Sequence, residues 1–174
     1  MHKSLLFLLS TLVFASHSRA SANIEGLEEP LEKQIVQQID QQLPQSIKLL
    51  MQAVDINSGT MNFAGVKQVG MLFKAEFDEL GMDTEWLEGK AFGRAGHLQA
   101  SYLSTNPQAP KILLIGHLDT VFAKDDSFQK HSVLDDQKIA GPGISDMKGG
   151  DVIIIAALRA LKELGLLKRL SIKW

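Results

Sequence analysis

The 174-residue chain contains no cysteine, and neither acidic nor basic residues predominate in it. Without cysteine the chain can form no disulfide and can offer no thiolate to a metal, so a metal site would need histidine and carboxylate ligands. The formal net charge of -2 at pH 7 argues against nucleic acid as a partner. Repeats and low-complexity segments are absent as well, and the 45% hydrophobic content indicates a globular protein with an ordinary core.

No hydrophobic run is long enough for a membrane span. The apolar run at residues 5–15 is shorter than the roughly 20 residues that cross a bilayer. It follows the basic residue Lys3 and precedes the small residues Ala20 and Ala22, which is the three-part layout of a secretory signal peptide. We therefore predict a signal peptide over residues 1–22, export to the periplasm or the medium, and no membrane contact after cleavage.

Helical and strand patterns alternate along the rest of the chain. Pro44 is expected to end a first helix and to begin a second one. The uninterrupted aliphatic run 111–115 is typical of a strand with both faces covered. The segment 151–164 begins apolar on every side, so that helix should be buried. The expected helices are 31–42, 44–54, 66–80 and 151–164, and the expected strands are 82–87, 97–103, 111–115 and 170–174, with a small hairpin at 132–134 and 138–140.

This alternation predicts an α/β fold with three layers, in which helices flank a mixed or largely parallel sheet. The last expected strand, 170–174, ends with the last residue of the sequence. Nothing would then continue or cover that strand, and we expect the sequence to be truncated.

His117 and Asp119 follow the expected strand 111–115 in the motif GHLDTV, residues 116–121. Residues i and i+2 of an extended chain point to the same side, and α/β folds usually place ligands at the carboxyl ends of strands. An aspartate at this spacing can orient a histidine that binds a metal. The alternative is a histidine and an aspartate that merely cap a loop.

Asp146 lies within a glycine-rich turn, GPGISDMKGG, at residues 141–150. Glycines let the backbone approach a ligand closely. Two other interpretations stay open: an ordinary turn with Ser145 or Asp146 as the helix N-cap, or an anion site at the helix N-terminus. The turn lacks the Gly-Lys-Ser/Thr ending of a P-loop, which disfavours phosphate.

The two motifs together resemble the M20 metallopeptidase family, which includes glutamate carboxypeptidases, acetylornithine deacetylases and succinyl-diaminopimelate desuccinylases. The sequence NSGT at residues 57–60 is also similar to that family, and the resemblance covers residues 43–174. It implies that His117 binds one of two zinc ions, that Asp146 bridges both ions next to a cis peptide bond, and that Asp119 is a catalytic residue behind His117.

The resemblance also implies an activity. Water activated by zinc would hydrolyse an amide bond in a small peptide or an N-acyl amino acid. Export and the residues around His117 favour a carboxypeptidase of the glutamate-carboxypeptidase kind. The full-length form is expected to be a homodimer.

The sequence departs from the family pattern where the family has an adjacent glutamate pair, one of them the base and the other a ligand. That pair follows the strand that corresponds to residues 170–174, and it is not present here. We therefore expect residues 23–174 to be the N-terminal part of an incomplete catalytic domain, inactive and poorly stable by itself. The alternatives are a non-catalytic secreted binding module that keeps the fold, or a phosphate-binding α/β domain.

Overall fold

The computed structural model describes residues 30–174, so the expected signal peptide at residues 1–22 lies outside the described residues. A four-stranded sheet has the strand order β1-β2-β6-β3, in which β6 runs antiparallel to β2 and parallel to β3. A separate hairpin is formed by β4 and β5. The elements are α1 (Pro30–Val54), α2 (Phe63–Glu79), β1 (Asp83–Glu88), β2 (Gly96–Tyr102), β3 (Lys111–Leu113), β4 (Ser132–Asp135), β5 (Lys138–Ala140), α3 (Gly149–Glu163) and β6 (Ser171–Lys173), with short helical turns at Lys90–Phe92, Ile144–Lys148 and Leu167–Arg169. This arrangement confirms the α/β fold with a mixed sheet.

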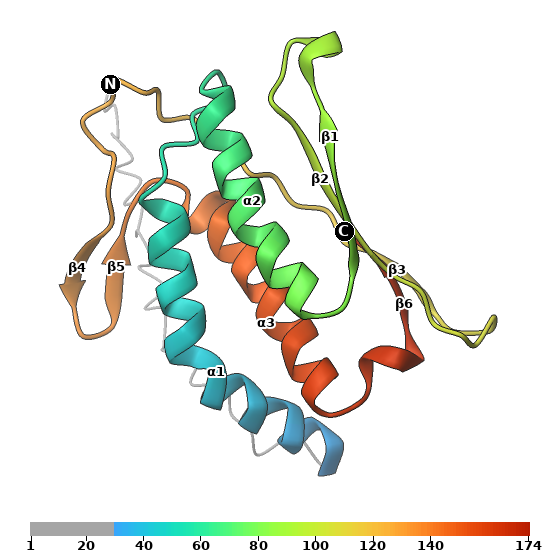
Figure 1. Cartoon of the computed structure of the whole chain (residues 1–174). Helices are drawn as coiled ribbons and strands as arrows, with labels where there is room; N and C mark the ends of the chain where they lie inside the picture. The colour runs from blue at the N-terminus through green and yellow to red at the C-terminus, as the bar shows by residue number, and fades with distance from the viewer. Residues whose placement is uncertain (1–29) are drawn as a thin grey trace, which may run out of the picture.

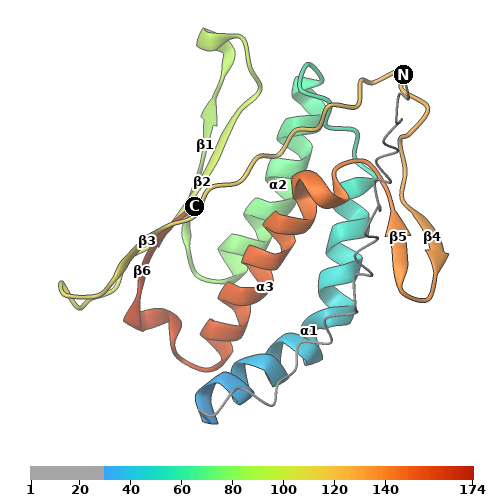
Figure 2. The same ribbon diagram turned by 180° about the vertical axis from the view of Figure 1, so that it is seen from behind.

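The described helices α1, α2 and α3 lie on one side of the sheet, as Figures 1 and 2 show from opposite directions. Helix α2 packs on β1 and β2, and α1 packs on α3. The core between these layers includes Phe73 and Phe77 from α2, Ile155 from α3 and Trp174 after β6. The ring of Phe77 lies 4.9 Å from that of Trp174. Among the described helices, none is long and apolar enough to span a bilayer.

Helix α2 follows directly from its sequence. Asn62 caps its first turn, since the side-chain oxygen accepts a hydrogen bond from the Gly65 amide. The buried residues Val66, Val69, Phe73 and Phe77 recur at helical spacing and face the sheet and the other helices. Gly81, at a φ of +78°, ends the helix in the left-handed conformation that glycine adopts most readily.

The prediction that Pro44 separates two helices is wrong, because α1 is one continuous helix with Pro44 inside it. Proline removes one backbone hydrogen bond and bends a helix. Pro44 is exposed, so water can satisfy the freed carbonyl, and Figure 1 shows α1 changing direction along its length. The buried residues Leu49, Ala53 and Val54 all follow the proline and hold the second half of α1 against the core.

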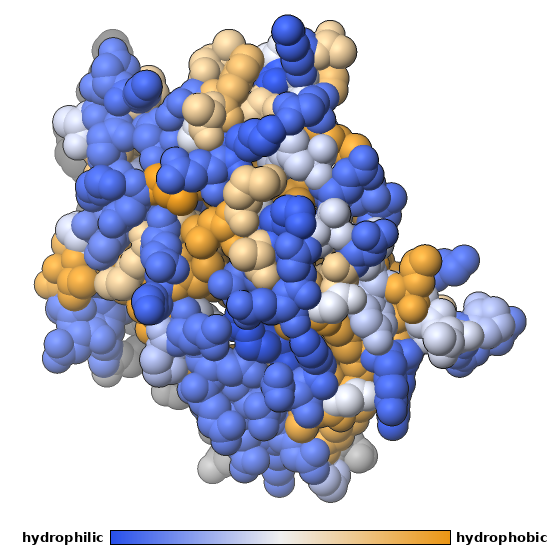
Figure 3. Space-filling view, viewed as in Figure 1, coloured by the Kyte–Doolittle hydropathy of each residue, from blue (hydrophilic) through white to orange (hydrophobic). Residues whose placement is uncertain are grey.

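Two expectations about burial are also wrong. The segment 111–115 was expected to be covered on both faces, yet Leu113 is 66% exposed and Ile115 is 77% exposed. Strand β3 lies at the edge of the described sheet, with β6 on one side only. Helix α3 buries Val152 and Ile155 but leaves Ile153 69% exposed on its outward face. The face of the molecule seen in Figure 3 is mainly hydrophilic, and hydrophobic residues form smaller areas on it.

The fully buried ring of Phe73 should be a main source of stability. We expect Phe73→Ala to lower the free energy of unfolding by about 3–5 kcal/mol, because it removes apolar contacts and leaves a cavity. Phe92→Ala is the matched control, since the Phe92 side chain is 53% exposed, and it should change the value by less than about 1 kcal/mol. Urea unfolding of both variants measures this, and equal losses would contradict the assignment of the core.

Candidate functional site

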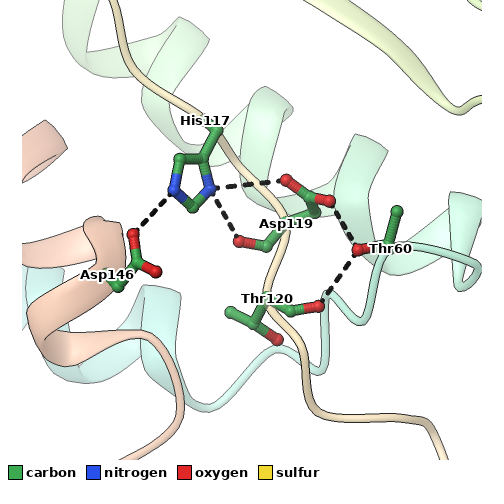
Figure 4. Close-up of polar contacts among 5 residues, drawn as sticks. All are labelled: Thr60, His117, Asp119, Thr120 and Asp146. Carbon is green, nitrogen blue, oxygen red and sulfur yellow. Dashed lines mark hydrogen bonds and ion pairs between the residues drawn. The ribbon is translucent and has the colours of Figure 1, made fainter.

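The chain brings His117 and Asp146 together from segments 29 residues apart. His117 follows β3, and Asp146 lies in the turn that precedes α3. Figure 4 shows the imidazole of His117 between Asp146 on one side and Asp119 on the other, and the distance from His117 Nε2 to Asp146 Oδ1 is 2.9 Å. The two residues that the motifs single out as metal ligands are therefore neighbours.

Asp119 lies on the opposite side of the ring. His117 Nδ1 is 3.0 Å from the main-chain oxygen of Asp119 and 3.4 Å from its carboxylate Oδ1. A carbonyl oxygen can only accept a hydrogen bond, so Nδ1 carries the proton and donates it to Asp119. This contact fixes the tautomer and directs Nε2 towards Asp146, as required of a histidine that binds a metal through Nε2.

The surroundings raise the pKa of His117 above its ordinary value. Burial by itself lowers that pKa, but the hydrogen bond to Asp146, the bond to the Asp119 carbonyl and the charges of both carboxylates together outweigh it. These contacts favour a proton on Nε2 that the ring donates to Asp146, and a metal ion at the same position would have to displace that proton.

Thr60, to which the sequence analysis gives no role beyond the NSGT resemblance, joins the site from the loop between α1 and α2. Its hydroxyl donates to Asp119 Oδ2 at 2.6 Å. The loop also pairs with the segment after β3, since Gly59 and Thr120 form an isolated parallel bridge. No local pattern marks this contact, because the two partners are 59 residues apart in the sequence.

The glycine-rich turn is held against the end of α1 by Lys148, which is fully buried. Lysine is rarely buried, and the sequence gives no sign of it. Its Nζ donates to the main-chain oxygens of Ala53 and Ile56, each at 2.9 Å, and so ties the turn to the end of α1. Burial lowers the pKa of Lys148 to about 8, and the charge of Asp55 opposes that shift. The peptide bond Asp146–Met147 is cis, as the family resemblance implies.

Asp151, in the first turn of α3, is a second buried ionisable group that the sequence analysis did not identify. It is 1% exposed, and neither carboxyl oxygen has a hydrogen-bond partner among the described residues. Burial raises the pKa of Asp151 to about 7, and the charge of His117 opposes that shift. The carboxyl lies so close to Gly116 that a Cβ atom at position 116 would collide with Oδ1, which explains the glycine before His117.

Two cavities flank the His117–Asp119 segment, with volumes of about 310 and 340 Å³. Both are lined by Thr60, His117 and Asp119. The first cavity extends to Trp174, and the second contains Asp146. A substrate or an ion therefore has access to His117 from either side.

The donor set suits zinc, which binds histidine nitrogen and carboxylate oxygen. The separation of His117 Nε2 and Asp146 Oδ1 is close to that of two ligands on one ion, about 3 Å for bonds of roughly 2 Å. The described residues contain no group of three or more histidine, cysteine or acidic side chains that could hold a metal. A metal ion held by His117 and Asp146 would therefore need further ligands from outside the described residues.

Comparison with known proteins identifies the family. Residues 113–174 match the family model described as peptidase family M20/M25/M40. Carboxypeptidase G2 of Pseudomonas sp. (strain RS-16) is 31% identical over 133 residues, which cover 70% of this chain and 29% of that protein. The structure of the dipeptidase Dug1p of Saccharomyces cerevisiae matches with a TM-score of 0.69 at 19% identity, and the match covers 81% of this chain and 33% of the Dug1p chain. Human carnosine dipeptidase 1 also matches with a TM-score of 0.69 at 19% identity, over 81% of this chain and 33% of that protein.

These matches confirm the family that the two motifs predict, and the chain belongs to the M20 peptidases. The two structural likenesses show that the fold is that of this class. The chain spans about a third of the length of these relatives.

The buried carboxyl of Asp151 predicts a pH-dependent stability. Because its folded pKa of about 7 lies above the unfolded value near 4, its contribution is complete below about pH 4 and is lost as the pH rises through about 7. Asp151→Asn should remove this loss and stabilise the fold at pH 8 by up to about 4 kcal/mol. Urea unfolding at pH 5 and pH 8, with the exposed Asp136→Asn as control, measures the effect. The same pH dependence in wild type and Asp151→Asn would contradict it.

Proposed function

We propose that this chain is part of a zinc-dependent exopeptidase that hydrolyses amide bonds in small peptides or N-acyl amino acids. The observation that carries the proposal is the approach of His117 Nε2 to Asp146 Oδ1, with the ring fixed by the main chain of Asp119. The similarity to carboxypeptidase G2 supports a carboxypeptidase of this kind. The binding-module alternative has no support among the proteins that the chain matches.

In this proposal His117 and Asp146 hold the metal, and Asp119 acts from behind His117. Bound zinc would supply the Lewis acidity that activates water towards an amide carbonyl. The residues of the chain itself supply orientation: Asp119 keeps the proton on Nδ1 and leaves Nε2 to the metal. Asp146 uses only Oδ1 towards His117, and its side chain is 83% exposed, so Oδ2 is accessible to a second ion.

The remaining ligands and the general base would come from a longer form of the protein, because its relatives are about three times as long. Strand β6 runs parallel to β3, so the carboxyl ends of both strands lie at the same edge of the sheet. The cavity of about 310 Å³ reaches both Trp174 and His117. Residues that follow Trp174 in a longer form would therefore enter beside the site. Export and a homodimer stay predictions from the sequence.

The assigned roles predict different defects in the longer, metal-loaded protein. His117→Ala and Asp146→Ala should each lower bound zinc at least tenfold, because each removes a ligand. Asp119→Ala should lower kcat by more than it lowers zinc content, because it removes the carboxylate that lies 3.4 Å from His117 Nδ1, and that carboxylate is not a metal ligand in this proposal. Elemental analysis after dialysis, together with hydrolysis of a panel of dipeptides and N-acyl amino acids, separates the two effects.

Asp136→Ala, at an exposed position of the β4–β5 hairpin, is the carboxylate control and should change neither quantity. Full zinc content in Asp146→Ala would refute its assignment as a ligand. Hydrolysis that survives complete removal of zinc would refute the proposed chemistry.

A further inference from the structure

We propose that Thr60 is a positioning residue of the active site, which holds the Asp119 carboxylate against the His117 ring. The inference rests on the proposed function, since it assigns Thr60 to the same reaction. It makes the loop between α1 and α2 part of the catalytic apparatus, although that loop supplies no metal ligand.

The contact itself is strong and directional. The Thr60 hydroxyl lies 2.6 Å from Asp119 Oδ2 and 3.3 Å from the main-chain oxygen of Thr120. A hydroxyl has one proton to donate, and a carboxylate is the stronger acceptor, so the proton goes to Asp119. Figure 4 shows Thr60 on the side of Asp119 that faces away from Asp146.

This contact decides which oxygen of Asp119 faces the histidine. With Oδ2 held by Thr60, Oδ1 remains 3.4 Å from His117 Nδ1. A carboxylate without such a restraint rotates about its last torsion, which is broad and roughly two-fold. Loss of the Thr60 hydroxyl would therefore free the Asp119 carboxylate to turn away from His117 Nδ1, while the main-chain oxygen of Asp119 would still hold the ring.

The loop that carries Thr60 is itself fixed to the segment after β3. The Thr60 amide donates to the Thr120 oxygen at 3.0 Å, and the Thr120 amide donates to the Ser58 oxygen at 2.9 Å. The Asn57 side chain donates to the Ala123 oxygen at 3.1 Å. At Gly59 a Cβ atom would collide with the Phe122 oxygen, so only glycine permits this close approach.

These bonds hold Thr60 in place by the backbone, independently of its hydroxyl. A variant that lacks only the hydroxyl should therefore keep the loop. The structural and the positioning roles of Thr60 can then be separated by experiment.

The test compares Thr60→Val, which removes the hydroxyl at nearly constant shape, with Thr60→Ser, which keeps it. Thr84→Val is the matched control, because the Thr84 hydroxyl also donates to an aspartate, Asp78, but on the exposed end of the sheet. In the longer, zinc-loaded enzyme, Thr60→Val should lower kcat about 10–100-fold and change KM and zinc content less than about threefold. Thr60→Ser should restore kcat to within about threefold, and Thr84→Val should leave it unchanged.

A second measurement does not depend on catalysis. In the 174-residue chain, NMR of the His117 ring nitrogens and the Asp119 side-chain carboxyl carbon should show shifts that change in Thr60→Val and return in Thr60→Ser. If these shifts, or kcat in an active enzyme, are the same in wild type and Thr60→Val, the positioning role is wrong. If the shifts change but the wild-type longer protein hydrolyses no amide, the proposed function fails, while the contact between Thr60 and Asp119 stands.

Discussion

The imidazole of His117 has two nitrogen atoms, and the site depends on both of them. One nitrogen contacts a residue of the same segment, and the other contacts a residue of the glycine-rich turn. Nδ1 is held by Asp119, two residues along the chain, and Nε2 faces Asp146 in the turn before α3. Asp119 is held in turn by Thr60 from the loop after α1. The segment after β3, the glycine-rich turn and the loop between α1 and α2 therefore meet through these hydrogen bonds. The fold matters because it sets the relative positions of these three segments.

The groups that support this line are costly to bury. Lys148 places an amine inside the protein, where it donates to two carbonyl groups at the end of α1. Carbonyl groups at a helix C-terminus carry partial negative charge, and this offsets part of the desolvation of the amine. Asp151 has no such partner among residues 30–174 and is held against Gly116 by close packing. Two buried ionisable groups, one near the end of the turn and one directly after it, indicate that its conformation is maintained at the expense of stability.

The sequence predicts those features that local spacing controls. The i, i+2 spacing places His117 and Asp119 on one side, and the repeat of apolar residues predicts helix α2 within a few residues. Asp146 required the second motif, because a glycine-rich turn alone has several interpretations. Thr60 and Lys148 were missed because their partners are distant in sequence, and no periodicity encodes such contacts. Pro44 was misjudged because an exposed helix tolerates the bend that proline imposes.

The errors about burial have a common physical cause, and it bears on the function. Ile115 and Ile153 are apolar residues in patterns typical of buried elements, yet both are exposed in the described part of the chain. Within the part of the chain that the structure describes, strand β3 has a neighbour on one side only, and the helices cover one face of the sheet. The proposed metal site is incomplete in the same way, since the described residues offer it two donors where zinc usually takes at least three from the protein. An open sheet edge beside an incomplete ligand set is the expected arrangement if further chain both extends the sheet and supplies the remaining ligands.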